Sequence, residues 1–172
     1  MNQNLDILIT EESIRKRVKE LGEKISSDYA GREIIAIGIL KGAWVFMSDL
    51  VREIEIPVIC DFIGVSSYGD AAVSSERVKL ISDIRIPING KEILLIDDII
   101  DTGFSINFVK GYIKSMNPAG IKVCVLLDKP SRRKLDIHVD YTGFTIPDRF
   151  VVGYGLDYAE KYRNLPYIAA IK

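Results

Sequence analysis

The sequence has few cysteines and no long apolar run. Only Cys60 and Cys124 occur in its 172 residues, and no CxxC spacing is present, so neither a disulfide scaffold nor a thiolate metal site is expected. Both cysteines lie in apolar runs, VICDF and VCVLL, which predicts buried strand thiols in a reducing compartment. No apolar stretch approaches the ~20 residues of a membrane span, and the N-terminal segment MNQNLDILIT does not resemble a signal peptide. We therefore expect a soluble, cytoplasmic protein with no membrane partner.

Charge of one sign is not in excess either. The chain has 23 Lys and Arg residues against 24 Asp and Glu residues, and its basic residues are scattered along the sequence. No overall field draws such a protein toward nucleic acid, and we expect no nucleic-acid partner. Hydrophobic residues make up 48% and charged residues 27%, as in ordinary globular proteins. Since linkers, repeats and low-complexity segments are absent, the sequence predicts a single domain over residues 1–172.

Short apolar runs alternate with amphipathic segments. The run IIAIGIL predicts a strand buried on both faces, and apolar residues at helical spacing follow Thr10, a helix-capping residue. This alternation favours an α/β fold with a Rossmann-like, mostly parallel sheet flanked by helices. Glycines and prolines break the last part of the chain, where we expect a small irregular hood, mainly over 129–172, built from C-terminal and N-terminal segments. The predicted helices cover 11–30, 43–54 and 105–116, and the predicted strands cover 34–40, 58–65, 78–84, 92–96, 122–127, 138–142 and 150–153.

Residues 66–77 interrupt this pattern with the small, polar segment SSYGDAAVSSER. A loop of this length is uncommon in a compact domain and is typical of lids and binding loops. A closing lid would keep water away from a reactive intermediate. We expect a lid over about 66–77, with disorder as the alternative reading.

The segment ILLIDDIIDTGFS, residues 93–105, is the most informative part of the chain. An apolar strand runs into Asp97 and Asp98, and Asp101 follows at the start of a DTGFS turn that opens a helix. The turn offers backbone N–H groups, hydroxyls and a helix N-terminus, which together suit a phosphate. Acids clustered there repel each other and the phosphate unless they bind ribose hydroxyls, a metal ion or a transferable proton. The segment therefore predicts a site for a phosphorylated sugar, whereas DTG alone would equally suit an ordinary turn.

This segment resembles the ribosyl-phosphate signature of the type I phosphoribosyltransferases. Four further segments resemble the hypoxanthine-guanine branch of that family, namely GILKGA (38–43), SSYG (66–69), LLDKPSRR (126–133) and the tail over 140–168. The resemblance implies the type I phosphoribosyltransferase fold. It also implies purine salvage: Mg²⁺-dependent transfer of a 5-phosphoribosyl group from phosphoribosyl pyrophosphate to hypoxanthine, guanine or both, giving IMP or GMP and pyrophosphate. The family further implies a homodimer or homotetramer.

The resemblance assigns roles to the central motif residue by residue. Asp97 and Asp98 match the acids that hold the ribose hydroxyls, directly or through magnesium, although the family more often has Glu at the first position. Asp101 matches the acid that takes a proton from the imidazole ring of the attacking base, which is general-base work. The 5′-phosphate loop corresponds to Asp101, Thr102, Gly103, Phe104 and Ser105, where Phe104 replaces a lysine of some relatives and is read as helix-start packing.

Other positions complete the implied site. Lys129 would donate to the 6-oxo oxygen and so reject adenine, Phe150 would stack on the purine, and Val151 would present backbone groups to it. Asp157 would flank the base and bind a second magnesium ion. The remaining matches are the pyrophosphate contacts Leu40, Lys41, Gly42 and Arg163, the lid residues Ser67 and Tyr68, and the magnesium ligands Asp97, Asp98 and Asp157.

Two other classes of function compete with this reading. A nucleotide-sensing regulator on the same fold would bind RNA or DNA, but it should show a basic face. A phospho-receiver domain also has paired acids at a strand end. A receiver, however, carries that pair after its first strand and needs several more strand–helix units than the residues after Asp98 supply.

Overall fold

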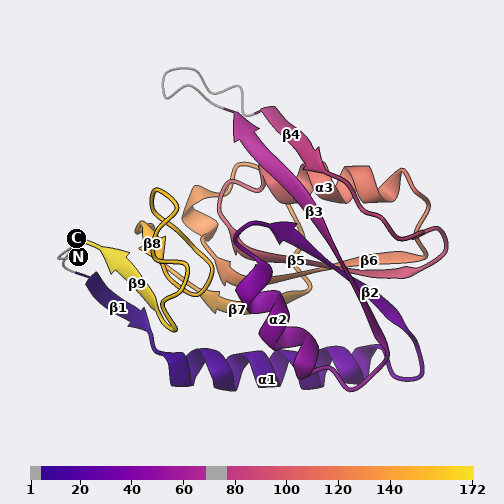
Figure 1. The fold of residues 1–172 in the computed structure, drawn as a ribbon, viewed down its shortest axis with the longest axis horizontal. Helices are drawn as coiled ribbons and strands as arrows, with labels where there is room; N and C mark the ends of the chain where they lie inside the picture. The colour runs from indigo at the N-terminus through magenta and orange to yellow at the C-terminus, as the bar shows by residue number, and fades with distance from the viewer. Residues whose placement is uncertain (1–4, 69–76) are drawn as a thin grey trace.

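The computed structural model describes residues 5–68 and 77–172, and its centre is a six-stranded sheet (Figure 1). The strand order is β4-β3-β2-β5-β6-β7, and all neighbours run parallel except β3 and β4. The predicted α/β fold with a mostly parallel sheet is therefore confirmed. The strands are β2 (Ile34–Leu40), β3 (Val58–Tyr68), β4 (Arg77–Ser82), β5 (Glu92–Ile100), β6 (Gly120–Asp128) and β7 (Tyr141–Thr145).

Three helices cover the two faces of this sheet. Helices α1 (Glu11–Asp28) and α2 (Trp44–Arg52) share one core cluster with the even-numbered residues of β2, whereas α3 (Phe104–Lys114) packs with the odd-numbered ones. This alternation is why β2 reads as a continuous apolar run. Helix α1 begins where the sequence predicts, because the Thr10 hydroxyl accepts a hydrogen bond from the Ser13 amide at 3.3 Å.

The expected hood contains a second, smaller sheet. Strands β1 (Leu5–Ile9), β9 (Ile168–Ile171) and β8 (Val151–Val152) pair antiparallel in that order. A 3₁₀ helix, η1 (Pro130–Arg132), precedes β8 and β9 along the chain. Sequence reading missed β1 and β9, which are short and lack any local pattern that separates them from loops. Figure 1 shows β1 and β9 side by side, so that both ends of the described chain meet at the hood.

Several predicted boundaries are wrong. Strand β3 extends to Tyr68 and pairs with Arg77 on β4, so residues 66–68 and 77 of the expected loop are strand, while 69–76 lie outside the described residues. Strand β7 lies three residues later than predicted because Cys124 pairs with Tyr141. Helices α1 and α2 are each shorter than predicted, and in the described residues no helix is long and apolar enough to cross a membrane.

The prediction of two buried thiols is half wrong. Cys124 is fully buried, as expected, but Cys60 is exposed. Cys60 pairs with Ala36 and so lies on the α1–α2 face of the sheet, where α2 packs mainly over β2 and β5 and leaves β3 open. Trp44 at the start of α2 is 48% exposed and therefore lies outside the core.

Candidate active site

A cavity of about 250 Å³ lies at the carboxyl ends of β2 and β5. Parallel pairing of these two strands brings the loop after β2 and the turn after β5 to the same edge of the sheet, the edge where α/β proteins bind ligands. The structure thus brings together most of the predicted phosphate, ribose and pyrophosphate contacts. Those that line the cavity are Leu40, Gly42, Asp97, Asp98, Asp101, Thr102, Gly103 and Ser105.

The turn after β5 has the shape expected of a phosphate loop. Gly103 has a φ of 94°, a left-handed conformation that glycine adopts without strain, and it directly precedes α3. No side chain caps this helix, so its first amides remain available to an anion. Phe104, by contrast, does not line the cavity, and its ring packs under the Lys134 ammonium, in agreement with a packing role.

One residue behind this loop was not predicted. The guanidinium of Arg133 donates from Nε to the Asp101 carbonyl at 3.2 Å and pairs with the Asp128 carboxylate at the end of β6. The next amide, that of Lys134, donates to the Thr102 carbonyl at 3.0 Å. The phosphate loop is therefore fixed from outside by the segment after η1. The only signal for this in the sequence was the pair of arginines in LLDKPSRR.

Asp97 and Asp98 lie within β5 rather than beyond its end, because β5 pairs with β6 as far as Ile100. On its other side β5 stops pairing with β2 at Ile96, which leaves both carboxyls beside the cavity. Burial, together with the adjacent Asp98 charge, raises the pKa of Asp97 well above its usual range, and burial also raises the pKa of Asp98.

This acid pair fits a magnesium ion in the chemistry of its donors. Two carboxylates at one buried spot repel each other, and a divalent cation with oxygen preference would relieve that repulsion. Asp157 does not join them, since no three metal-ligating side chains converge anywhere in the described part of the chain. The Asp157 carboxylate instead pairs with Arg163 at 2.8 Å.

The predicted pyrophosphate loop, residues 40–42, lies directly against Asp98 of the acid pair. The Leu40–Lys41 peptide is cis, and a Cβ placed on Gly42 would lie 1.8 Å from Asp98 Oδ2, so only glycine fits there. The Lys41 ammonium does not line the cavity. It reaches across to the hood, where Glu160 accepts from it at 3.1 Å and also lies 3.3 Å from the Arg163 guanidinium.

Glu160 was missed by sequence reading, because nothing in AEKYRN marks this acid as a partner of two cations from distant segments. The hydrogen bond from Lys41 and then that from Arg163 hold the pKa of Glu160 below its usual range. The two cations expected to bind pyrophosphate are thus already brought together by one carboxylate.

The residues predicted to bind the base gather at the hood. Lys129 is 6% exposed, and its ammonium donates to the Arg149 carbonyl at 2.9 Å and lies 4.0 Å from Asp101 Oδ2. Arg132 Nε lies 3.3 Å from Asp101 Oδ1, and Asp148 lies within 4 Å of both cations, a charge network that the sequence did not reveal.

Phe150 and Val151 occupy opposite environments. The Phe150 ring is 55% exposed and meets Tyr158 edge to face, which leaves a ring face open for stacking, whereas Val151 is buried in β8.

The expected contact of Asp157 with the base stays a prediction. Ser67 and Tyr68 lie at the end of β3, and their side chains are outside the described part of the structure.

Comparisons with known proteins agree with this site. A family model described as "Phosphoribosyl transferase domain" matches residues 6–159. The hypoxanthine-guanine phosphoribosyltransferase of Bacillus subtilis is 51% identical over 96% of this chain and 92% of that protein. A crystal structure of a hypoxanthine-guanine phosphoribosyltransferase from Bacillus anthracis matches with a TM-score of 0.92 and 46% identity, over 99% of this chain and 100% of that chain. The chain belongs to the hypoxanthine-guanine phosphoribosyltransferase family.

The hypoxanthine phosphoribosyltransferase of Salmonella typhimurium is also similar, at 42% identity over 99% of this chain and 97% of that protein. The implied enzyme class, a transferase of purine salvage, is therefore confirmed, and so is the expected fold. This family assignment removes the phospho-receiver domain as an alternative.

Replacing Asp97 with Asn should stabilise the ligand-free phosphoribosyltransferase while impairing its activity. The raised pKa means that the folded chain binds this proton more tightly than the unfolded chain, so its stability falls as pH rises above the ordinary aspartate value of 3.8. We expect the free energy of unfolding of Asp97→Asn to exceed that of the parent by about 1 kcal/mol or more at pH 7.5, with a smaller gap near pH 5. Urea unfolding at both pH values measures this, with exposed Asp136→Asn as the control. A less stable Asp97→Asn at pH 7.5 would contradict it.

Replacing Gly42 with Ala should displace the Asp98 carboxylate, because the new methyl group would overlap it. A misplacement of about 1 Å in an active site can cost about 100-fold in rate, and we expect a loss of that order in kcat/KM for phosphoribosyl pyrophosphate. The control is Gly111→Ala in α3, where a Cβ meets nothing within 4 Å. Steady-state kinetics compare the two variants, and near-parent activity of Gly42→Ala would show that the close approach is unimportant.

Proposed function

We propose that this enzyme transfers the 5-phosphoribosyl group to hypoxanthine, guanine or both, with Asp101 as the general base and Lys129 as the donor that selects 6-oxopurines. The observation that carries this proposal is the distance of 4.0 Å between Lys129 Nζ and Asp101 Oδ2. A buried cationic donor and a carboxylate acceptor thus lie side by side between the phosphate loop and the hood.

This spacing suits one edge of a 6-oxopurine. Atoms O6 and N7 are neighbours on that edge, whereas adenine presents an N6 amino donor in place of O6. Lys129 would donate to O6 while Asp101 accepts the proton carried by N7. Asp101 Oδ1 is buried and lies 3.3 Å from Arg132 Nε, but it accepts no hydrogen bond among the described residues, so this carboxylate has capacity for a further donor. A lysine that is 6% exposed and faces the adenine amino group would be left without an acceptor there.

The rest of the cavity would hold phosphoribosyl pyrophosphate. Positive charge builds on the ribose ring and negative charge on the departing pyrophosphate as the glycosidic bond forms and the C1–oxygen bond breaks. Asp97 and Asp98 are placed to hold the ribose hydroxyls and stabilise the ring, while the loop amides of 101–105 bind the 5′-phosphate. Lys41, Gly42 and Arg163 would bind the leaving pyrophosphate, with the Leu40 backbone beside them.

Magnesium is part of the proposal. Asp97 and Asp98 would hold one ion, and Asp157 would contribute to a second, with substrate oxygens completing each shell. When bound, the metal neutralises the leaving pyrophosphate. This chain's own residues position the ribose and take the proton from the base.

We also propose that the whole chain works as one domain, that it is cytoplasmic and that it forms a homodimer or homotetramer. Two free cysteines agree with a reducing compartment. Trp44 and Phe62 are exposed at 48% and 37% on the α2 side of the sheet, which supports contact with a second copy.

Replacing Asp101 with Asn should abolish most turnover while preserving phosphate binding, because the backbone of the loop is unchanged. General-base catalysis contributes about 10²–10⁴-fold, and we expect kcat for IMP formation to fall by that factor. The dissociation constant for phosphoribosyl pyrophosphate, measured by calorimetry, should stay within about threefold of the parent value, since amides rather than this carboxylate hold the phosphate. An equal loss of binding and turnover would remove Asp101 as the base.

Replacing Lys129 with Ala should reduce discrimination between hypoxanthine and adenine. We expect the ratio of their kcat/KM values to fall by about 100-fold or more, because selection by a buried donor is lost. A spectrophotometric assay with each free base measures this ratio, and Lys114→Ala at the exposed end of α3 is the control. An unchanged ratio would contradict the role of Lys129.

A further inference from the structure

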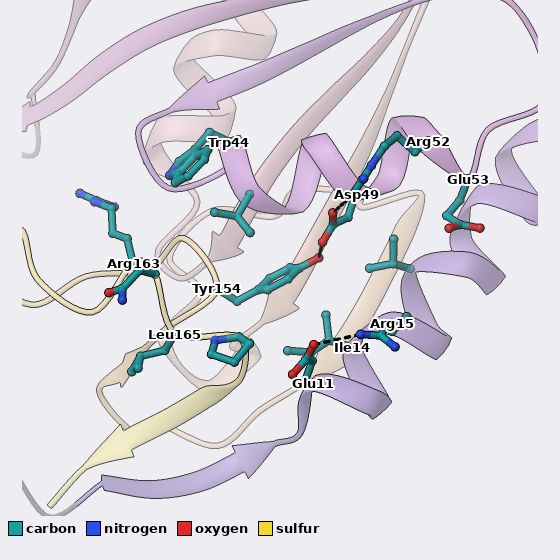
Figure 2. Close-up of a pocket in the computed structure, with 14 residues that line it drawn as sticks. Glu11, Ile14, Arg15, Trp44, Asp49, Arg52, Glu53, Tyr154, Arg163 and Leu165 are labelled. Carbon is teal, nitrogen blue, oxygen red and sulfur yellow. Dashed lines mark hydrogen bonds and ion pairs between the residues drawn. The ribbon is translucent and has the colours of Figure 1, made fainter.

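A second cavity, of about 700 Å³, lies apart from the one at the carboxyl ends of β2 and β5 and shares no lining residue with it (Figure 2). Its walls are α1, α2 and the hood segment around 163–166. A partly buried hydrogen bond joins the hood to α2 here: the Tyr154 hydroxyl donates to Asp49 Oδ2 at 2.5 Å. Figure 2 shows the Tyr154 ring extending from the hood toward α2, with its hydroxyl on the Asp49 carboxylate. Tyr154 is only 6% exposed.

Tyr154 stands at the start of the turn that carries the hood's proposed pyrophosphate contact. Its amide donates to the Leu165 carbonyl at 2.8 Å, and the amide of Gly155 donates to the Arg163 carbonyl at 3.0 Å. In return, the Arg163 guanidinium donates to the Gly155 carbonyl at 2.7 Å. The location of this guanidinium is therefore tied to the backbone next to Tyr154.

The same turn touches the pyrophosphate loop. Gly155 has a φ of 101°, and a Cβ there would lie 2.2 Å from the Gly42 carbonyl oxygen, so the two backbones are in direct contact. Asp49 belongs to α2, the helix that follows this loop in the chain. These contacts form a closed ring. The pyrophosphate loop leads into α2, which carries Asp49, and Asp49 accepts the hydrogen bond from Tyr154. Gly155, the next residue, then contacts the pyrophosphate loop again.

We propose that Tyr154 and Asp49 are positioning residues that hold the hood turn against the pyrophosphate loop, so that the Gly42 backbone and the Arg163 guanidinium bind the leaving group together. This inference rests on the proposed pyrophosphate roles of those two residues. Neither Tyr154 nor Asp49 lines the cavity of the active site, so both act through the groups they hold.

The hydrogen bond adds direction to the contact between the hood turn and α2. Ile14 and Leu165 line the same cavity as Tyr154, and apolar contacts of this kind have no preferred direction. Burial, and then the hydrogen bond to Asp49, raise the pKa of Tyr154, so its hydroxyl stays a donor at any working pH. An ion pair from Arg52, drawn in Figure 2, holds the Asp49 carboxylate in turn.

Tyr154→Phe removes the bond and keeps the ring. We expect KM for phosphoribosyl pyrophosphate and the dissociation constant for pyrophosphate with magnesium to rise about tenfold, a typical effect of losing a hydrogen bond to a charged group. The dissociation constant for IMP, which carries no pyrophosphate, should change less than about twofold, since phosphate and base contacts persist. A purely structural role would weaken IMP as well.

Tyr141→Phe is the matched control. Tyr141 is equally buried, at 5% exposure, and donates to Asp28 Oδ2 at 2.8 Å, at the opposite end of the strands. The Tyr141→Phe variant should leave KM for phosphoribosyl pyrophosphate unchanged. Asp49→Ala should reproduce Tyr154→Phe without adding to it in the double variant, and Asp49→Asn, which keeps an acceptor, should restore most of the affinity.

Arg163→Met separates this inference from the proposed function. If Arg163→Met leaves KM for phosphoribosyl pyrophosphate unchanged, the pyrophosphate role of Arg163 is wrong, and the positioning role falls with it. If Arg163→Met raises that KM but Tyr154→Phe and Asp49→Ala do not, only the positioning role is overturned. The positioning role is also overturned if Tyr154→Phe weakens the binding of IMP as much as that of pyrophosphate. It is overturned as well if Tyr141→Phe raises KM for phosphoribosyl pyrophosphate as much as Tyr154→Phe does. Should Tyr154→Phe fail to fold, Asp49→Ala and Asp49→Asn decide by the same measurements.

Discussion

The parallel pairing of β2 with β5 is the constraint on which the site depends. It sets Gly38 beside Ile96, so both strands release their loops at the same edge of the sheet. The loop after β2 then contacts the acid pair of β5 closely enough that no side chain fits at residue 42. A slip of register between these strands would separate the groups that we propose bind the two ends of one substrate, even if each loop kept its own shape.

Charge is distributed unevenly around this edge. Asp97 is buried and Asp98 is half-buried, and neither has an ion pair with lysine or arginine among the described residues. Four other acids each lie within 4 Å of lysine or arginine, namely Asp101, Asp148, Asp157 and Glu160. The unpaired acids destabilise the empty fold, and a bound cation or ribose would offset that cost. The paired acids instead hold their cations in place. The site is thus prepared for a substrate that is anionic at both ends and becomes cation-like in the middle.

Local patterns in the sequence predicted the parts of the site that one segment builds alone. The apolar run before Asp97 and the glycine at 103 indicated a strand and an anion-binding turn, because period and turn chemistry are local. Contacts between distant segments could not be read in this way. Glu160 meets Lys41 only after folding, and the exposure of Cys60 depends on which strands α2 covers. Strand β1 forms by pairing with β9, which also pairs with β8. The roles of separate residues such as Lys129 came from resemblance rather than from local physics.

The hood sheet has a consequence for how the enzyme matures. Val151 lies on β8, which pairs with β9, and β9 in turn pairs with β1, from a segment far away in the sequence. Contacts of such sequence separation are slow to form. We therefore expect the hood sheet, and with it the proposed purine contact at Val151, to form after the central sheet.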